Sequence, residues 1–326
     1  IRLGRLDQAE AVLQECRELY RQLGILAVPG YGTDPATPLS LIATIRGDYA
    51  SALQYGEQAL RESETQRHQA NLCLAYYALA SAAFGQGQYP TARQYAQQAY
   101  SLTQQRADRW FMAYCLNLLG ETALALGEVT LAQHQLEASY SLRQEFNDPE
   151  GMAVALNHLG KIALQQEQYE QARQLYQQSL DIYQHIFDKG GLAQAYLGLG
   201  TVASRQGDVP QAQPQLHQAL QLAAEIQFVP LVYSILKAIG ELLLKSNRLE
   251  YGFKVLAFVR QHTGSDHATQ AEVQQLLDRY NSEAGKENTD ILAVAQAYAE
   301  NRTWLEIVTE LLSEATEASN PVHSDR

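Results

Sequence analysis

Residues Asn157–Ala172 read NHLGKIALQQEQYEQA, and this stretch decides the fold. It combines a glycine, a turn and an alanine, and these features return every 40 residues. The glycine position holds Gly120, Gly160, Gly200 and Gly240, with Ala80 before them. The alanine position holds Ala92, Ala132, Ala172 and Ala212, with Gly252 after them. A fixed period of about 20–50 residues predicts a repeat architecture, in which each unit packs only against its neighbours.

The small residues predict a close crossing of two antiparallel helices in each unit. Gly160 on the first helix and Ala172 on the second would let the backbones approach, with Leu159, Leu164 and Leu175 around the crossing. A glycine inside a helix costs about 1 kcal/mol relative to alanine, so its return in successive copies indicates that packing requires it. A large side chain at Gly160 should overpack the crossing and cost about 1–3 kcal/mol.

The period predicts paired helices along most of the chain. First helices are expected near 67–86, 108–126, 148–166, 188–206 and 229–246, and second helices near 89–105, 129–145, 169–186, 209–225 and 249–262. Helices are also expected at 7–23, 36–46 and 49–64, on either side of an irregular Gly- and Pro-rich insertion at about 25–38. Asp148-Pro149 and Val229-Pro230 resemble helix starts, and Pro214 should kink its helix or delay its onset.

Three segments follow from this pattern. Residues 1–262 are expected to form the repeat solenoid, 263–312 a C-terminal helical cap, and 313–326 a frayed tail. Within the cap, helices are expected at 268–282, 290–300 and 303–312, with a polar loop at 283–289. The first unit has only its second helix, so we expect the chain to be a fragment of a longer protein that continues upstream.

The composition of the chain limits which classes of function are expected. The chain has 326 residues, 46% of them hydrophobic, and a formal net charge of −12. Because phosphate contacts need clusters of Lys and Arg, we expect no direct contact between this segment and nucleic acid. No apolar run approaches the roughly 18 residues that a membrane helix needs, and no signal peptide is visible. We therefore expect a cytoplasmic protein without membrane contact.

Motifs for catalysis and metal binding are absent from the sequence. Cys16, Cys73 and Cys115 are isolated, which predicts free thiols rather than a disulfide framework or a zinc site. His262 and His267 flank a break in the period but have no ligand partners at metal spacing. Neither His-Glu-x-x-His nor Gly-x-Ser-x-Gly occurs. We expect no metal, no cofactor and no enzymatic activity.

The concave surface is the expected place of function, because stacked helix pairs curve and their first helices line the inside. If the recurring glycine is position eight of the first helix, positions two, five, nine and thirteen point inward. The candidate binding residues at these positions are Tyr77, Tyr114, Asn117, Glu121, Asn157, Lys161, Arg205 and Lys237.

Each type of candidate residue suggests one contact. The amides of Asn117 and Asn157 stand on adjacent helices and could hold an extended peptide backbone. The tyrosines add flat contact area, and the three cations would select acidic groups. The alternatives remain that each Asn bonds only to the next helix, that the cations are merely solvated, and that Glu121 forms only a weak surface pair with Lys161.

The period, the small residues and the turns resemble those of tetratricopeptide repeats, although the usual repeat is shorter than the present 40 residues. The segments Asn117–Gly120 and Asn157–Gly160 are similar to the long repeats of kinesin light chains and of bacterial STAND-class regulators of the MalT type. Residues Ala297–Val308 resemble the tail after the repeats of such regulators, with Asn301 where glycine is usual. The resemblance implies an all-α, right-handed solenoid of antiparallel helix pairs.

In that family the repeats form the sensor arm of a nucleotide-binding switch ATPase. The resemblance therefore implies a non-catalytic arm for signal transduction and transcription regulation. It implies a protein or peptide in the groove as partner, together with an upstream domain of the same chain. ATP binding would belong to the upstream part, because no Gly-x-x-x-x-Gly-Lys-Ser/Thr occurs here. Two alternatives stay open: a stand-alone scaffold or adaptor, and a bacterial receptor for peptide pheromones.

Overall fold

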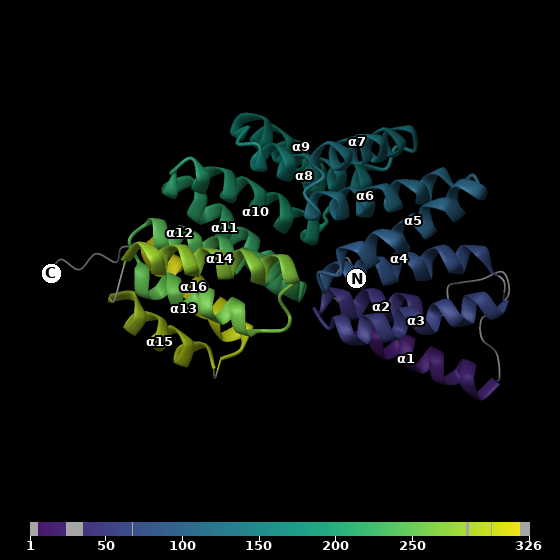
Figure 1. The fold of residues 1–326 in the computed structure, drawn as a ribbon, viewed down its shortest axis with the longest axis horizontal. Coiled ribbons are helices and arrows are strands. Elements are labelled where there is room, and N and C mark those ends of the chain that lie inside the picture. Colours follow the sequence, from purple (N-terminus) through teal and green to yellow (C-terminus); the bar gives the residue numbers. More distant parts are fainter. Residues whose placement is uncertain (1–5, 24–34, 67, 285–286, 301, 320–326) are drawn as a thin grey trace.

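A computed structural model describes residues 6–23, 35–66, 68–284, 287–300 and 302–319 of the chain. These residues form sixteen α-helices and no strand (Figure 1). The helices are α1 (Leu6–Leu23), α2 (Ala36–Ile45), α3 (Tyr49–Gln66), α4 (Gln69–Gly85), α5 (Tyr89–Gln105), α6 (Arg109–Ala125), α7 (Val129–Glu145), α8 (Pro149–Gln165), α9 (Tyr169–Ile186), α10 (Lys189–Arg205), α11 (Val209–Glu225), α12 (Val229–Lys245), α13 (Leu249–Gln261), α14 (His267–Ala284), α15 (Glu287–Ala299) and α16 (Trp304–Ser319).

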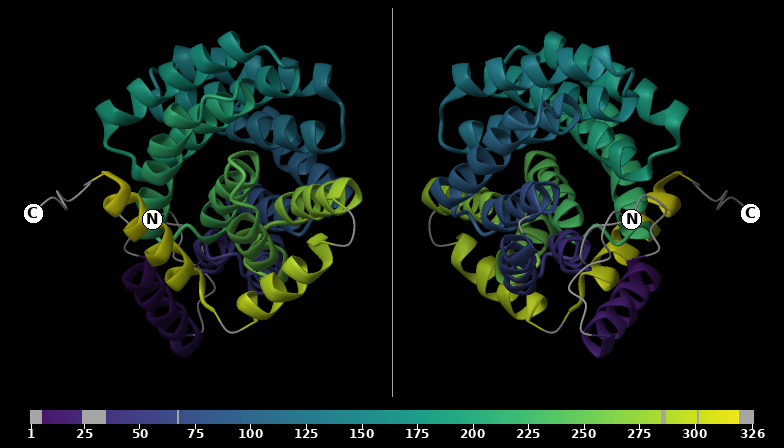
Figure 2. Two further views of the ribbon diagram at one scale, coloured as in Figure 1. Left: turned by 90° about the vertical axis from the view of Figure 1, so that its left-hand side faces the viewer. Right: turned by 90° about the vertical axis from the view of Figure 1, so that its right-hand side faces the viewer.

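Consecutive helices pack in pairs from α2–α3 to α12–α13, and each pair packs on the next. The predicted all-α solenoid is therefore confirmed. The first helices α4, α6, α8, α10 and α12 also contact one another in succession, whereas successive second helices have at most marginal contact. Because helices crowd together on the inside of a curved stack, the first helices form the concave surface. Figure 2 shows the resulting arc.

Several predicted boundaries need correction. Helix α11 begins at Val209 and continues through Pro214, so the proline does not delay its onset. The cap of α12 is Phe228 rather than Val229, although Asp148 caps α8 as expected. The loop predicted at 283–289 is too long, since α14 reaches residue 284 and α15 begins at 287. Helix α16 extends to residue 319 rather than 312. Of the predicted insertion, residues 36–38 belong to α2, and 25–34 lie outside the described residues.

The recurring glycines make room for a side chain that the alanine pattern did not predict. A Cβ on Gly120 would lie 2.7 Å from Leu136 Cγ, and a Cβ on Gly160 would lie 3.0 Å from the ring of Tyr176. Both partners stand four residues after the recurring alanine. Gly200 and Gly240 have the same relation to Leu216 and Leu256. The glycine therefore compensates for a large residue on the second helix, in addition to allowing close approach.

A second compensation of side-chain size occurs where a second helix packs against the first helix of the next repeat. The buried Tyr183 lies over Gly191, where a Cβ would be 2.1 Å from the tyrosine ring. The next repeat carries the reverse sizes at the equivalent positions, Ala223 and Leu231, and both are buried. Each interface thus holds one large and one small residue, as close packing of a core requires.

The arc brings the loop before α14 back to the N-terminal turns (Figure 2). Gly47, at the turn between α2 and α3, stands so close to Gly264 that a Cβ on Gly47 would lie 2.4 Å from the Gly264 oxygen. In the α4–α5 turn, a Cβ on Gly87 would lie 2.3 Å from His267 Cγ. The ring of Tyr89 also stacks edge to face on His267, with centroids 6.2 Å apart. We call these contacts the closure.

The closure can be tested by comparing two glycines with the same backbone conformation. Gly47 has φ +72° and Gly127 has φ +79°, but a Cβ on Gly127 would meet nothing within 4 Å. Alanine at either position should cost about 1–2 kcal/mol because of the left-handed conformation. Only Gly47→Ala should also open the closure and raise the radius of gyration in small-angle X-ray scattering. Equal radii for the two variants would show that the closure does not hold the arc.

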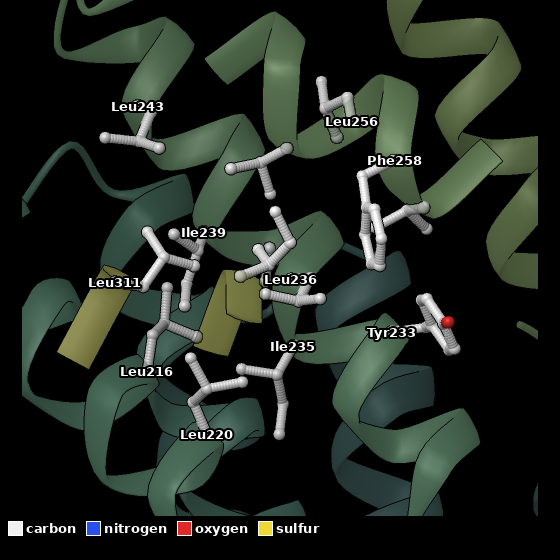
Figure 3. Close-up of a cluster of buried hydrophobic side chains, with 14 of the residues drawn as sticks. Leu216, Leu220, Tyr233, Ile235, Leu236, Ile239, Leu243, Leu256, Phe258 and Leu311 are labelled. Atoms are coloured by element: carbon white, nitrogen blue, oxygen red, sulfur yellow. The ribbon is translucent and has the colours of Figure 1, made fainter. Parts of the chain in front are cut away.

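The largest buried cluster among the described residues joins the last repeats to α14, α15 and α16. Figure 3 shows Leu216 and Leu220 of α11 near Ile239 of α12 and Leu311 of α16. Leu311 is 2% exposed. Helix α16 thereby covers the apolar side of the last repeats, which is the role that terminal elements have in solenoids.

Candidate functional site

One stripe of side chains runs along the inner face of α6. It comprises Trp110, Tyr114, Asn117 and Glu121, which share one face of the helix by their spacing. Two of its members reach the neighbouring first helices: the ring of Tyr114 is 6.3 Å from that of Tyr77 on α4, and Glu121 lies near α8. These contacts between first helices place the stripe on the concave surface.

The two asparagines are buried with unused hydrogen-bonding capacity. Asn117 and Asn157 are each 7% exposed. Among the described residues, neither amide atom of Asn157 has a hydrogen-bond partner, and neither does the Asn117 oxygen. A buried polar group without a partner costs about 1–3 kcal/mol. The alternative that Asn157 serves the fold by bonding to the next helix has no hydrogen bond to support it in the described part of the chain.

The tyrosines belong to an aromatic cluster at the N-terminal end of the groove. The ring of Tyr77 lies 5.6 Å from Phe111 and makes an edge contact with Tyr114. Trp110 lies 4.8 Å from Tyr114 and is 46% exposed. Burial raises the pKa of Tyr77, and the nearby Glu121 adds to the shift, so the hydroxyl stays protonated at neutral pH. The cluster therefore offers neutral aromatic surface to the groove.

A buried arginine supports this cluster from the second helix. Arg143 of α7 is fully buried, and its guanidinium lies 3.7 Å from the centre of the Tyr114 ring. Its Nη1 donates to Asp148 at 2.5 Å, while Nε and Nη2 have no hydrogen-bond partner among the residues that the structure describes. Gly151 makes space for it, since a Cβ there would lie 2.4 Å from Arg143 Cδ. The cation thus fixes the position of Tyr114 by a cation–π contact.

The predicted cations lie on three successive first helices, α8, α10 and α12. Lys161 is exposed and forms no ion pair with any described residue. Arg205 lies 3.7 Å from Glu241. Lys237 donates to Glu272 of α14, so the chain itself supplies its acidic partner.

Glu272 lies within the electrostatic range of all three cations. Burial alone would raise the pKa of this carboxyl, but the bonded Lys237 outweighs it, with help from Lys161 and Arg205. The pKa of Glu272 is therefore lowered, and the side chain is ionised at neutral pH. Since three cations from separate helices act on one carboxylate, they share one region of the groove.

Glu121 has a different partner from the one considered in the sequence. Its carboxylate lies 3.4 Å from Nε2 of His158, whereas no ion pair joins it to Lys161 among the described residues. Burial lowers the pKa of His158, and the opposing effect of Glu121 does not restore it. The pair is therefore a contact between a carboxylate and a largely neutral imidazole at pH 7.

Sequence reasoning missed four residues of this region, Trp110, Arg143, His158 and Glu272, and predicted Asp148 as a helix cap but not as the partner of Arg143. Trp110 could have been found, because it stands four residues before Tyr114 on the same helix face. Arg143 could not, since an arginine on a glutamine-rich helix suggests a solvated charge. Glu272 follows Lys237 by 35 residues and lies where the 40-residue period ends.

A separate cavity lies on the outer side of the solenoid. It has a volume of about 510 Å³ and opens between α7, α8 and α9. Its lining is mostly glutamine and aliphatic, with Glu137 as its charged residue. This cavity contains none of the predicted binding residues and serves below as a control position.

The described residues give no support for a metal site or for a membrane-spanning helix. No group of three His, Cys, Asp or Glu side chains there is arranged to hold a metal ion. Of the helices described, none has the length and apolarity to cross a membrane. The three cysteines are free, and Cys73 and Cys115 are buried.

Two parts of the chain match family models of the tetratricopeptide repeat, residues 111–185 and residues 197–250. The long helix pairs of the solenoid are thus built from repeats similar to this family. No curated protein sequence matches the chain significantly.

Several solved structures have a similar fold. A Rap protein solved with competence and sporulation factor has a TM-score of 0.64 and 14% identity, and 95% of this chain and 96% of that chain are covered. NprR solved with its cognate peptide NprX has a TM-score of 0.61 and 14% identity, with 97% of both chains covered. The Cut9–Hcn1 heterotetramer of APC/C has a TM-score of 0.56 and 16% identity, covering 90% of this chain and 46% of that one. At these identities the likeness is one of fold, and the fold is that of a tetratricopeptide-like helical solenoid.

Proposed function

We propose that this chain is a non-catalytic repeat domain that binds a peptide in its concave groove, as the sensor arm of a larger bacterial regulator. The observation that carries the proposal is the pair of buried asparagines on adjacent first helices. Neither amide atom of Asn157 is hydrogen bonded among the described residues, and a peptide backbone offers both a donor and an acceptor. A peptide in the groove would satisfy polar groups that the fold leaves unsatisfied.

The surroundings of the pair suit an extended peptide. Aromatic side chains lie on one side of it and cations on the other. Two proteins of similar fold were solved with a ligand, Rap with competence and sporulation factor and NprR with its cognate peptide NprX. The link to an upstream domain rests on the resemblance to STAND-class regulators, and binding would act on that domain by changing the curvature of the arc.

The test is capture of natural peptides by the immobilised protein. Peptides from a size-fractionated cell extract of the source organism are passed over wild-type protein, Asn157→Leu and Gln133→Leu, and eluates are identified by mass spectrometry. Gln133 lines the outer cavity, so its variant is a matched change of a polar residue to leucine. We expect peptides from the wild type and from Gln133→Leu, and a loss of about tenfold or more for Asn157→Leu, since unpaired backbone groups of the peptide are costly.

Two outcomes would contradict this proposal. If Asn157→Leu retains the same peptides as the wild type, the pair does not hold the ligand. If only Gln133→Leu loses them, the binding site is the outer cavity. Circular dichroism serves as the control, to check that the three proteins have equal helix content.

A peptide-pheromone receptor is the second candidate. The observation in its favour is that Rap and NprR match this chain along nearly its whole length. Short secreted peptides among the captured ligands would support it over a regulator that senses intracellular protein segments.

A further inference from the structure

We propose that the groove selects an acidic peptide that carries an aromatic residue at its other end, and that Glu272 competes with this peptide for the groove cations. The inference rests on the proposed peptide-binding function and adds the chemical class of the ligand. It follows from three features that lie in order along the solenoid.

The first feature is exposed aromatic surface. Trp110 is 46% exposed although its ring contacts Tyr114 at 4.8 Å. Tyr114 itself is held between the ring of Tyr77 and the buried guanidinium of Arg143. Large, rigid aromatic surface of this kind binds an apolar or aromatic side chain at low entropic cost.

The second feature is the pair of asparagines between the aromatic and cationic ends. Asn117 lies on the same stripe of α6 as Trp110, and Asn157 lies on the same stripe of α8 as Lys161. A peptide backbone bonded to both amides would therefore extend from the aromatic cluster toward the cations.

The third feature is an excess of positive charge in an acidic protein. The part of the groove around Glu241 and Glu272 carries four cations, Lys161, Arg205, Lys237 and Lys245, whereas Glu150 of the same stripe of α8 lies at the aromatic end, near Tyr114. Glu241 is shared by Arg205 at 3.7 Å and Lys245 at 3.0 Å. The local excess is two positive charges, whereas the whole chain carries −12. Charge complementarity therefore favours an anionic ligand at this end.

Glu272 already acts as an acidic ligand of this region. It binds Lys237, and the charges of Lys161 and Arg205 also reach it. An incoming carboxylate at Lys161 and Arg205 would approach Glu272 and be repelled by it. Removing the charge of Glu272 should therefore strengthen the binding of an acidic peptide.

The probes are three hexapeptides studied by isothermal titration calorimetry. The first carries tryptophan at one end and two aspartates at the other, and both sequence orders are tested. The second has lysines in place of the aspartates, and the third has alanine in place of tryptophan. We expect the peptide with tryptophan and aspartates, in one of its two sequence orders, to bind about tenfold more tightly than either control peptide at low salt. Its affinity should fall as the salt concentration rises.

Two pairs of variants test the residues. Lys161→Glu should weaken binding of the first peptide about tenfold, whereas Lys189→Glu should not, because Lys189 pairs with Glu225 outside the stripe. Glu272→Gln should tighten it about fivefold. Glu250→Gln removes an exposed carboxylate that pairs with Lys254 on α13 and should leave binding unchanged.

The outcomes separate this inference from the proposed function. Equal affinity for the three hexapeptides overturns the selection of acidic ligands but leaves peptide binding intact. Absence of binding by all three also overturns it, while the natural-peptide capture above decides independently whether the groove binds peptides at all. Unchanged affinity in Glu272→Gln overturns the competition.

Discussion

Asp148→Ala is expected to lower the free energy of unfolding by about 3–5 kcal/mol, because it leaves a buried guanidinium without its counter-ion. The side chain of Arg143 is fully buried, and Asp148 is its ion-pair partner at 2.5 Å. Asp148 also caps α8, since its Oδ1 accepts a hydrogen bond from the Gly151 amide at 3.1 Å. The substitution removes both interactions, and urea denaturation followed by circular dichroism measures their sum.

The neighbouring repeat provides the control. Asp108 caps α6 through the Phe111 amide at the same distance of 3.1 Å, but no ion pair involves it among the described residues. Asp108→Ala should therefore cost only about 1 kcal/mol, the usual value of a cap. In an Arg143→Met background, Asp148→Ala should cost no more than this. A loss of about 1 kcal/mol from Asp148→Ala in the wild-type protein would show that the buried pair contributes little.

Gly191→Leu is the second change with a large expected effect. A Cβ at this position would lie 2.1 Å from the ring of Tyr183, and the tyrosine is 1% exposed and cannot move toward solvent. Overpacking should cost about 3 kcal/mol. Tyr183→Ala alone should cost about 3–5 kcal/mol, because it leaves a cavity.

The double variant tests the size compensation directly. Tyr183→Ala with Gly191→Leu recreates the pair that the next repeat carries as Ala223 and Leu231. We expect the double variant to be no less stable than Tyr183→Ala alone, because the leucine enters the cavity that the tyrosine leaves, with a favourable coupling of about 3 kcal/mol in a double-mutant cycle. Additive losses would indicate that the two positions do not share one packing site.

The regular part of the fold was predictable because each 40-residue unit repeats its own local signals. The glycine, the turn and the alanine fix where one helix ends and the next begins, so α4 to α13 lie close to their expected ranges. The crossing was predicted less well. The alanine was taken to be the partner of Gly160, whereas Tyr176, one helical turn further on, fills the space.

Contacts that depend on the curvature of the whole arc could not be predicted. The approach of Gly47 to Gly264 joins residues that are more than 200 positions apart, and it results from small rotations that add up over every repeat. The pairing of Lys237 with Glu272 has the same origin, because α14 continues the inner layer after the sequence period has ended. The candidate residues on the inner stripe were found from spacing alone. Spacing did not predict which of them have a hydrogen-bond or ion-pair partner within the chain and which have none.

The proposed function and a purely structural role of Asn157 predict opposite effects of Asn157→Leu on the free energy of unfolding. If Asn157 is kept for a ligand, its unpaired amide is a cost that the free protein bears. Leucine should then be better tolerated than asparagine, and the equivalent position of the next repeat already holds Leu197.

The most direct measurement is urea denaturation of Asn157→Leu, carried out on the same preparation that is used for peptide capture. We predict a free energy of unfolding about 1–2 kcal/mol higher than that of the wild type, together with the loss of captured peptides. A lower free energy of unfolding with peptides still captured would contradict the account, because it would make Asn157 a structural residue and not part of a binding site.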